Sequence, residues 1–268
     1  MIGLYAKAAA GAVLPRAKSL PDTVLSRSVT PSLGQLADYS AVCGFALTDT
    51  LPVTFPHILA FGLQMELMAA RSFPLAPPGL VHVANTITVH RAIGLDERLD
   101  LRVHAERFAA HARGAQVDLV SAVSAGGAVV WEGRSTYLAR GAQAPTGIAG
   151  ELPEIAVPQG PAAALWTVGG DLGRRYAAVS GDVNPIHLNS LAAKAFGFPR
   201  TIAHGMWTAA HALASLQGRT PDALTYTVLF RKPLLLPSKA ELVTERTDGG
   251  WNLAVRNRAG LNLSGSVR

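Results

Sequence analysis

The chain has 268 residues, of which 49% are hydrophobic and only 16% are charged. This composition excludes a largely disordered protein, because disordered segments combine low hydrophobicity with high charge, and the length suits two domains of ordinary size. The formal net charge of +6 comes from scattered Lys and Arg residues rather than a clustered basic face, so we expect no nucleic-acid partner, whereas a phosphate-bearing small ligand fits.

The cellular compartment is predicted from the single cysteine and from the opening residues. Cys43 alone excludes an intramolecular disulfide and a cysteine-based zinc site, and it fits a reducing compartment. The apolar opening (residues 1–17) is a poor signal peptide, because it lacks a basic start and Lys7 interrupts it. No segment approaches the ~20 apolar residues of a membrane span. We therefore predict a cytoplasmic protein with no membrane association.

The first half of the chain predicts two helices followed by four strands. The helices have apolar residues at helical spacing, and the strand segments are rich in β-branched or alternating residues. The predicted helices cover residues 32–44 and 54–71, and the strands cover 81–89, 99–108, 116–123 and 129–138.

A segment rich in Pro, Gly and Ala (residues 141–161) then predicts a linker, and a similar order of elements follows it. We therefore predict an N-terminal domain over residues 1–140 and a C-terminal domain over residues 162–268. In the second half the predicted helices cover residues 172–179 and 204–216, and the strands cover 225–231, 240–247, 251–256 and 261–267.

Two pairs of short motifs indicate that the halves are copies of one domain. The segment YSAVCG (residues 39–44) matches YAAVSG (residues 176–181), and TFPH (residues 54–57) matches TIAH (residues 201–204) in the same order. A long apolar helix followed by antiparallel strands predicts an α+β layout, with the helix packed on one face of a sheet.

The segment that follows YAAVSG (residues 176–181) carries the candidate chemistry. Asp182 and His187 are five residues apart, with Asn184 and Pro185 between them, and we predict a structured loop rather than a helix over residues 182–187. A carboxylate beside an imidazole forms a general acid–base pair. Asp182 also suits a plain turn residue, so a purely structural role stays open.

Other reactions receive less support from the sequence. A metal site made of Asp182, His187 and His204 lacks any recognised ligand spacing, so we predict no metal. Nucleophilic catalysis is disfavoured because Ser180 lies in no G-x-S-x-G motif and Cys43 lacks a histidine-bearing loop beside it.

The start of the last apolar helix is a candidate oxyanion site. The first amides of a helix lack intrahelical partners, and Gly205 would let a ligand approach them closely. For the His204 side chain we favour a structural role over catalysis, and for His211 we expect interior packing.

These residues resemble the MaoC-like dehydratases, in particular the (R)-specific enoyl-CoA hydratases. The resemblance rests on SGDVNPIH (residues 180–187), IAHGM (residues 202–206) and FRKP (residues 230–233), which stand in the family's order. It implies a double hot-dog fold, with two antiparallel sheets each wrapped on a long central helix, and it implies no metal and no cofactor.

The resemblance also implies roles for individual residues. Asp182 and His187 would activate a water, Asn184 would support them, and the Gly205 amide would polarise a thioester carbonyl. It further implies substrate-binding roles for Ser180, His204, Met206, Arg231 and Lys232, the last two near the phosphates of CoA.

The implied reaction is the reversible hydration of trans-2-enoyl-CoA to (R)-3-hydroxyacyl-CoA in fatty-acid metabolism. The alternatives are the same reaction on an acyl-carrier-protein thioester, thioester hydrolysis and non-catalytic binding of an acyl thioester. In the first half Phe45 replaces the aspartate and Ile58 the helix-start glycine. That half is expected to lack a polar site and to complete a pseudo-dimer with one active site, while a homodimer of the chain stays open.

Overall fold

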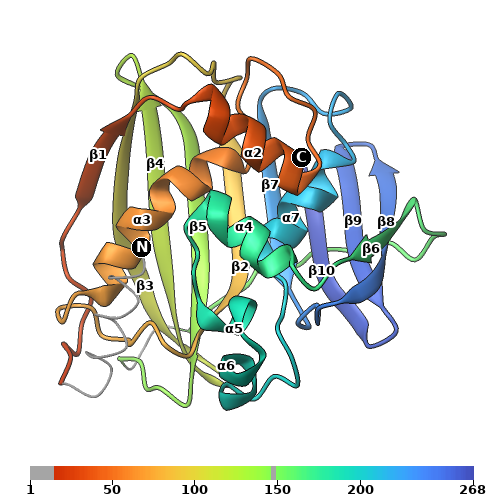
Figure 1. The fold of residues 1–268 in the computed structure, drawn as a ribbon. Coiled ribbons are helices and arrows are strands. Elements are labelled where there is room, and N and C mark those ends of the chain that lie inside the picture. Colours follow the sequence, from red (N-terminus) through yellow and green to blue (C-terminus); the bar gives the residue numbers. More distant parts are fainter. Residues whose placement is uncertain (1–14, 146–148) are drawn as a thin grey trace.

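The computed structural model describes residues 15–145 and 149–268, so the apolar opening up to residue 14 lies outside the described residues. The described strands form one antiparallel sheet of ten strands in the order β1-β3-β4-β5-β2-β7-β10-β9-β8-β6. Figure 1 shows that the helices cover one face of this curved sheet. None of the described helices is long and apolar enough to cross a membrane.

The first half supplies five strands and two helices. In chain order these are β1 (Leu25–Val29), α2 (Leu33–Cys43), α3 (Phe55–Ala69), β2 (Leu80–Val89), β3 (Leu99–His111), β4 (Gly114–Ala125) and β5 (Ala128–Arg140).

The second half supplies the other five strands and four described helices. These are β6 (Ala164–Val168), α4 (Leu172–Ser180), α5 (Pro185–Leu188), α6 (Ser190–Ala195), α7 (Gly205–Ala214), β7 (Leu224–Phe230), β8 (Ser238–Thr247), β9 (Gly250–Asn257) and β10 (Gly260–Val267).

The two halves meet at the centre of the sheet, where β2 pairs with β7 from Ala84↔Leu229 to Val89↔Leu224. On either side of this junction the strand order repeats, since β5, β4, β3 and β1 follow β2 as β10, β9, β8 and β6 follow β7. The expected α+β hot-dog layout is confirmed, but the two expected sheets are joined into one. Edge-to-edge pairing satisfies backbone groups that two separate sheets would leave unpaired.

The two long apolar helices occupy the core positions predicted for them. In α3 twelve of the fifteen residues are buried, and in α7 seven of the ten are buried. An all-round apolar helix is stable only when protein covers most of its surface. α3 packs on β3 and β4, whereas α7 packs on β9 and β10, so each half has a helix on its own strands.

Contacts from α7 to the end of α2 bind the halves together on the helical face. Trp207 donates its indole N–H to the carbonyl of Val42 (2.9 Å), and His211 places Nδ1 against the carbonyl of Cys43 (2.8 Å). These carbonyls belong to the last turn of a helix, where no intrahelical donor reaches them. His211 is half-buried. In addition to the interior packing expected for it, its ring provides a hydrogen-bond partner for a carbonyl at the end of α2.

The sequence patterns missed the short elements β1, β6 and α6. The edge strand β1 has no buried residue, and in α6 only Ala193 is buried, so neither carries a clear apolar period. The edge strand β6 pairs only with β8 and contributes two buried residues, Trp166 and Val168. Elements this short depend on tertiary contacts that a local pattern does not record.

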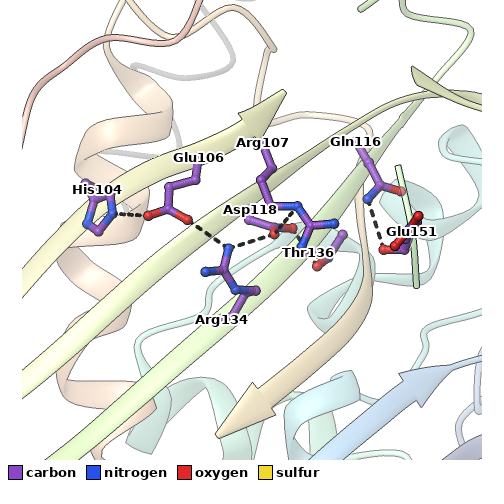
Figure 2. Close-up of polar contacts among 8 residues, drawn as sticks. All are labelled: His104, Glu106, Arg107, Gln116, Asp118, Arg134, Thr136 and Glu151. Atoms are coloured by element: carbon purple, nitrogen blue, oxygen red, sulfur yellow. Dashed lines mark hydrogen bonds and ion pairs between the residues drawn. The ribbon is translucent and has the colours of Figure 1, made fainter. Parts of the chain in front are cut away.

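The outer face of the N-terminal strands holds a buried carboxylate network (Figure 2). Asp118 on β4 is almost fully buried, and it accepts hydrogen bonds from Arg134 (2.9 Å) and from the Thr136 hydroxyl (2.7 Å). Arg107 approaches the same carboxylate to 3.7 Å from a bulge in β3, where its φ is 53°. Three donors thus share one buried charge, and the network crosses β3, β4 and β5.

Residues 149–151 of the segment predicted as a linker lie on this outer face. The Gln116 side chain donates to the backbone carbonyl of Glu151 (3.4 Å), and a bridge joins Ala110 to Ala149. Farther along, the amide of Ala163 donates to the carbonyl of Leu242 on β8. The segment therefore crosses from β3 to β8, while the domain boundaries at residues 140 and 162 stay predictions.

Candidate active site

Asp182 directly follows the end of α4, which closes on a left-handed glycine. Gly181 has φ 73°, and its amide donates to the carbonyl of Ala177 (2.9 Å), so the chain turns sharply away from the helix. The Ser180 hydroxyl donates to the carbonyl of Tyr176 (2.8 Å) and accepts from the amide of Asp182 (3.2 Å). The contacts of Ser180 thus fix the backbone that carries Asp182.

The segment after Asp182 contains a helical turn, which corrects the predicted loop over residues 182–187. The Asp182 carboxylate accepts from the amide of Asn184 (3.2 Å), and the Asn184 side chain in turn accepts from the amide of Ile186 (3.3 Å). Asn184 is therefore the N-cap of the short helix Pro185–Leu188, and its proline opens that helix. The same Asn-Pro pair that favours a turn also begins a helix.

His187 lies in this turn with its ring orientation fixed. Its Nδ1 is 2.8 Å from the carbonyl oxygen of Ile202, which only accepts, so Nδ1 carries the proton and Nε2 is the basic nitrogen of the neutral ring. The side chain is buried. Gly173 on α4 passes so close to His187 that a Cβ there would overlap the His187 carbonyl oxygen.

His204 is the N-cap residue of α7 and packs its ring on that of His187. The ring centroids are 3.7 Å apart, and Nε2 of His204 donates to the backbone carbonyl of Asp182 (2.9 Å). The same Nε2 is 3.8 Å from the Asp182 carboxylate. His204 therefore ties α7 to the loop after α4 and places Asp182 beside His187, while the substrate-binding role implied for it stays a prediction.

Both imidazoles are held neutral at physiological pH. Burial lowers the pKa of His187, although the charge of Asp182 opposes this shift. Burial and the neighbouring His187 together lower the pKa of His204 to about 3. A neutral His187 with a basic Nε2 next to a partly exposed carboxylate is a suitable arrangement for moving a proton.

Gly205 opens α7, and its lack of a side chain makes room for a protein ring. A Cβ at this position would lie 2.9 Å from Cε1 of Phe230. The expectation that the glycine serves close approach of a ligand is therefore incomplete, because Phe230 fills the space beside its Cα. Its amide still belongs to the first turn of the helix, where backbone N–H groups lack intrahelical acceptors. Met206 next to it is buried.

The hydrogen bonds of Arg231 and Lys232 are made to residues outside the Asp182 cluster. Both are exposed beyond the end of β7, where Lys232 donates to the carbonyl of Ala259 (2.7 Å) and Arg231 lies 3.4 Å from the Ser264 hydroxyl. Their predicted contact with CoA phosphates stays a prediction.

The three central side chains also form a cluster that could hold a metal ion. Asp182, His187 and His204 each offer one ligand atom, and these atoms lie within 4.8 Å of one another. The sequence analysis considered these three residues as ligands and predicted no metal because their spacing matches no recognised site. Two of the imidazole nitrogens already contact backbone carbonyls, so each ring has one nitrogen left.

The N-terminal half contributes a buried polar cluster that the sequence analysis did not expect. His82 on β2 lies between the rings of Tyr137 (4.6 Å between centroids) and Phe230 (4.8 Å), and the buried ring of His57 is 6.2 Å away. This half therefore holds more buried polar side chains than expected, while its lack of an active site of its own stays a prediction. The match of TFPH with TIAH gave the signal, since it pairs His57 with His204.

The buried histidines predict that the fold loses stability in mild acid. Burial lowers the pKa of His57 to about 4 and that of His204 to about 3, against about 6.5 in an unfolded chain. The unfolded state therefore binds more protons below pH 6.5, so stability is complete above that value and falls as pH decreases. We expect roughly 1.4 kcal/mol per pH unit for each histidine.

Urea unfolding followed by circular dichroism at pH 7, 6 and 5 measures this loss. The His57→Gln variant should show a shallower dependence on pH than the wild type. A free energy of unfolding that stays constant from pH 7 to 5 would contradict the prediction.

The chain is similar to known proteins in both sequence and fold. Residues 165–258 match the model of the MaoC like domain. The chain is 43% identical over 259 residues to 3-hydroxyacyl-thioester dehydratase X of Mycobacterium tuberculosis, covering 94% of this chain and 91% of that protein. The crystal structure of HtdX from the same organism is similar with a TM-score of 0.82 and 40% identity, over 92% of this chain and 99% of that one.

A more distant structure supports the fold alone. RV0216 of Mycobacterium tuberculosis, described as a double hotdog fold, has a TM-score of 0.56 at 14% identity, over 91% of this chain and 94% of that one. The fold and the homology together define an enzyme of the hydro-lyase class with a double hot-dog architecture. Within that class, the chain belongs to the MaoC-like dehydratase family.

Proposed function

We propose that this protein catalyses the reversible hydration of trans-2-enoyl-CoA to (R)-3-hydroxyacyl-CoA. The observation that carries the proposal is the hydrogen bond from His187 Nδ1 to the Ile202 carbonyl, because it leaves the basic Nε2 beside Asp182. A relative that is 43% identical is a 3-hydroxyacyl-thioester dehydratase, and that reaction is the same one in reverse.

In the proposed reaction a water adds its hydroxyl to C3 of the enoyl thioester and a proton to C2. Asp182 and His187 hold this water. One of them removes a proton from the water as its oxygen bonds to C3, and the pair then delivers that same proton to C2. Asn184 supports them by capping the turn that carries His187. The amide of Gly205 hydrogen-bonds the thioester oxygen, which gains negative charge as the enolate forms.

Hydration of crotonyl-CoA by the purified protein tests this proposal. We expect the absorbance of the enoyl thioester to decrease, with the (R) product, and we expect the same rate after treatment with EDTA. Longer enoyl-CoAs in parallel measure the acyl chain length that the site accepts.

Three results would contradict the proposed function or its mechanism. Release of free CoA, detected with a thiol reagent, would indicate hydrolysis instead of hydration. A folded protein that hydrates no CoA ester but hydrates an enoyl-acyl-carrier protein would replace CoA by the carrier protein. Loss of activity with EDTA, restored by a divalent cation, would identify Asp182, His187 and His204 as metal ligands.

A further inference from the structure

Two histidines of the N-terminal half lie at the junction with the catalytic half. His57 is the third residue of α3, near the start of that helix, as His204 is at the start of α7. His82 lies on β2, the strand that pairs with β7. The two rings are nearly parallel, with 6.2 Å between centroids.

One aromatic ring connects this pair with the candidate active site. Phe230 on β7 is 4.8 Å from His82 between centroids, and its Cε1 lies 2.9 Å from where a Cβ on Gly205, at the start of α7, would stand. The charge of Asp182 also acts on both histidines, since it raises their pKa values against the larger effect of burial. His57 and His82 therefore lie within electrostatic range of Asp182, although they belong to the opposite half of the chain.

Each of these rings has an enclosed nitrogen without a hydrogen-bond partner among the described residues. These atoms are Nδ1 of His57 and Nε2 of His82. Nδ1 of His204 is likewise enclosed with no partner in the described part of the chain, whereas His187 and His211 place Nδ1 on backbone carbonyls. A polar atom enclosed without a partner is costly, so these three nitrogens from both halves indicate that a ligand supplies their partner.

We propose that His57 and His82 complete the active site from the N-terminal half by hydrogen-bonding the reacting water, which is the 3-hydroxyl group in the dehydration direction. This proposal rests on the proposed hydratase function. Burial keeps both rings neutral, with the pKa of His57 lowered to about 4 and that of His82 to about 3. A neutral imidazole offers one donor and one acceptor, so it can hydrogen-bond the water. Removal of the water's proton is left to Asp182 and His187.

The test compares leucine and glutamine variants at each histidine. We expect His82→Leu and His57→Leu to lower kcat for crotonyl-CoA by about 10- to 100-fold, the effect of one lost hydrogen bond in the transition state. KM and the inhibition constant of butyryl-CoA, which has neither the double bond nor a hydroxyl, should change less than about twofold. His82→Gln and His57→Gln, which keep a hydrogen-bonding group, should recover most of kcat. Phe61→Leu is the matched packing control, since its ring lies 6.2 Å from His57 and has no polar atom.

The outcomes separate this proposal from the proposed function. Leucine variants with the wild-type kcat would overturn this proposal. It would also be overturned if kcat of the leucine variants fell only as far as that of Phe61→Leu and butyryl-CoA bound more weakly to them. A wild type that hydrates nothing would contradict the proposed function itself. In that case, binding of (R)-3-hydroxybutyryl-CoA and butyryl-CoA is compared. A preference for the hydroxyl that is lost in His82→Leu supports the contact, and an unchanged ratio overturns it.

Discussion

Replacing Asp182 by Asn or His187 by Gln is expected to lower kcat for hydration by about 10²- to 10⁴-fold, the usual contribution of a general acid–base group. Both changes nearly preserve shape, so the capping bonds around the site should persist. Because the two side chains act on one water, the double variant should be little worse than the more severe single variant. Stopped-flow or steady-state hydration of crotonyl-CoA measures all three.

Matched controls exclude a general effect of these substitutions. Asp222→Asn and His90→Gln make the same chemical changes at exposed positions outside the cluster, and both should retain the wild-type rate. A strictly multiplicative double variant would indicate that Asp182 and His187 act in separate steps. Near-wild-type activity in either single variant would remove that residue from the reaction.

The order of elements could be predicted from the sequence because most of them carry a strong local pattern. The apolar helix α3 and the strands β2 to β5 were predicted within a few residues of their ends. Burial gives the apolar residues of a helix and those of a strand different spacings along the sequence. The joining of both halves into one sheet was not predicted. It depends on the pairing of β2 with β7, residues more than a hundred positions apart, and no local pattern encodes such a pairing.

The site was predicted where residue type and spacing coincide along the chain. Asp182 and His187 lie close in sequence, and the motif resemblance marked both. The contribution proposed for His57 and His82 was missed because they are ordinary members of an apolar helix and a strand. Tertiary packing, such as that of Phe230 between His82 and Gly205 and of α2 against α4, brings the N-terminal half next to the loop that carries Asp182.

Replacing Gly173 by Ala is expected to reduce kcat/KM for crotonyl-CoA by about 100-fold while the fold is retained. A methyl group there would overlap the carbonyl oxygen of His187, so α4 and α5 must move apart and His187 must shift. A displacement of about 1 Å in a catalytic group can cost about 10²-fold in rate, whereas overpacking at such a contact costs about 1–3 kcal/mol of stability. Circular dichroism should therefore show native helix content with a lower melting temperature.

Gly34→Ala provides the control, because a Cβ at Gly34 on α2 meets no atom within 4 Å. That variant should keep full activity and gain slightly in stability, since alanine favours a helix over glycine. Full activity in Gly173→Ala would mean that α4 can yield without moving His187. A rate that falls in Gly173→Ala but not in Gly34→Ala would instead show that a glycine outside the Asp182 to His187 segment sets the position of the catalytic base.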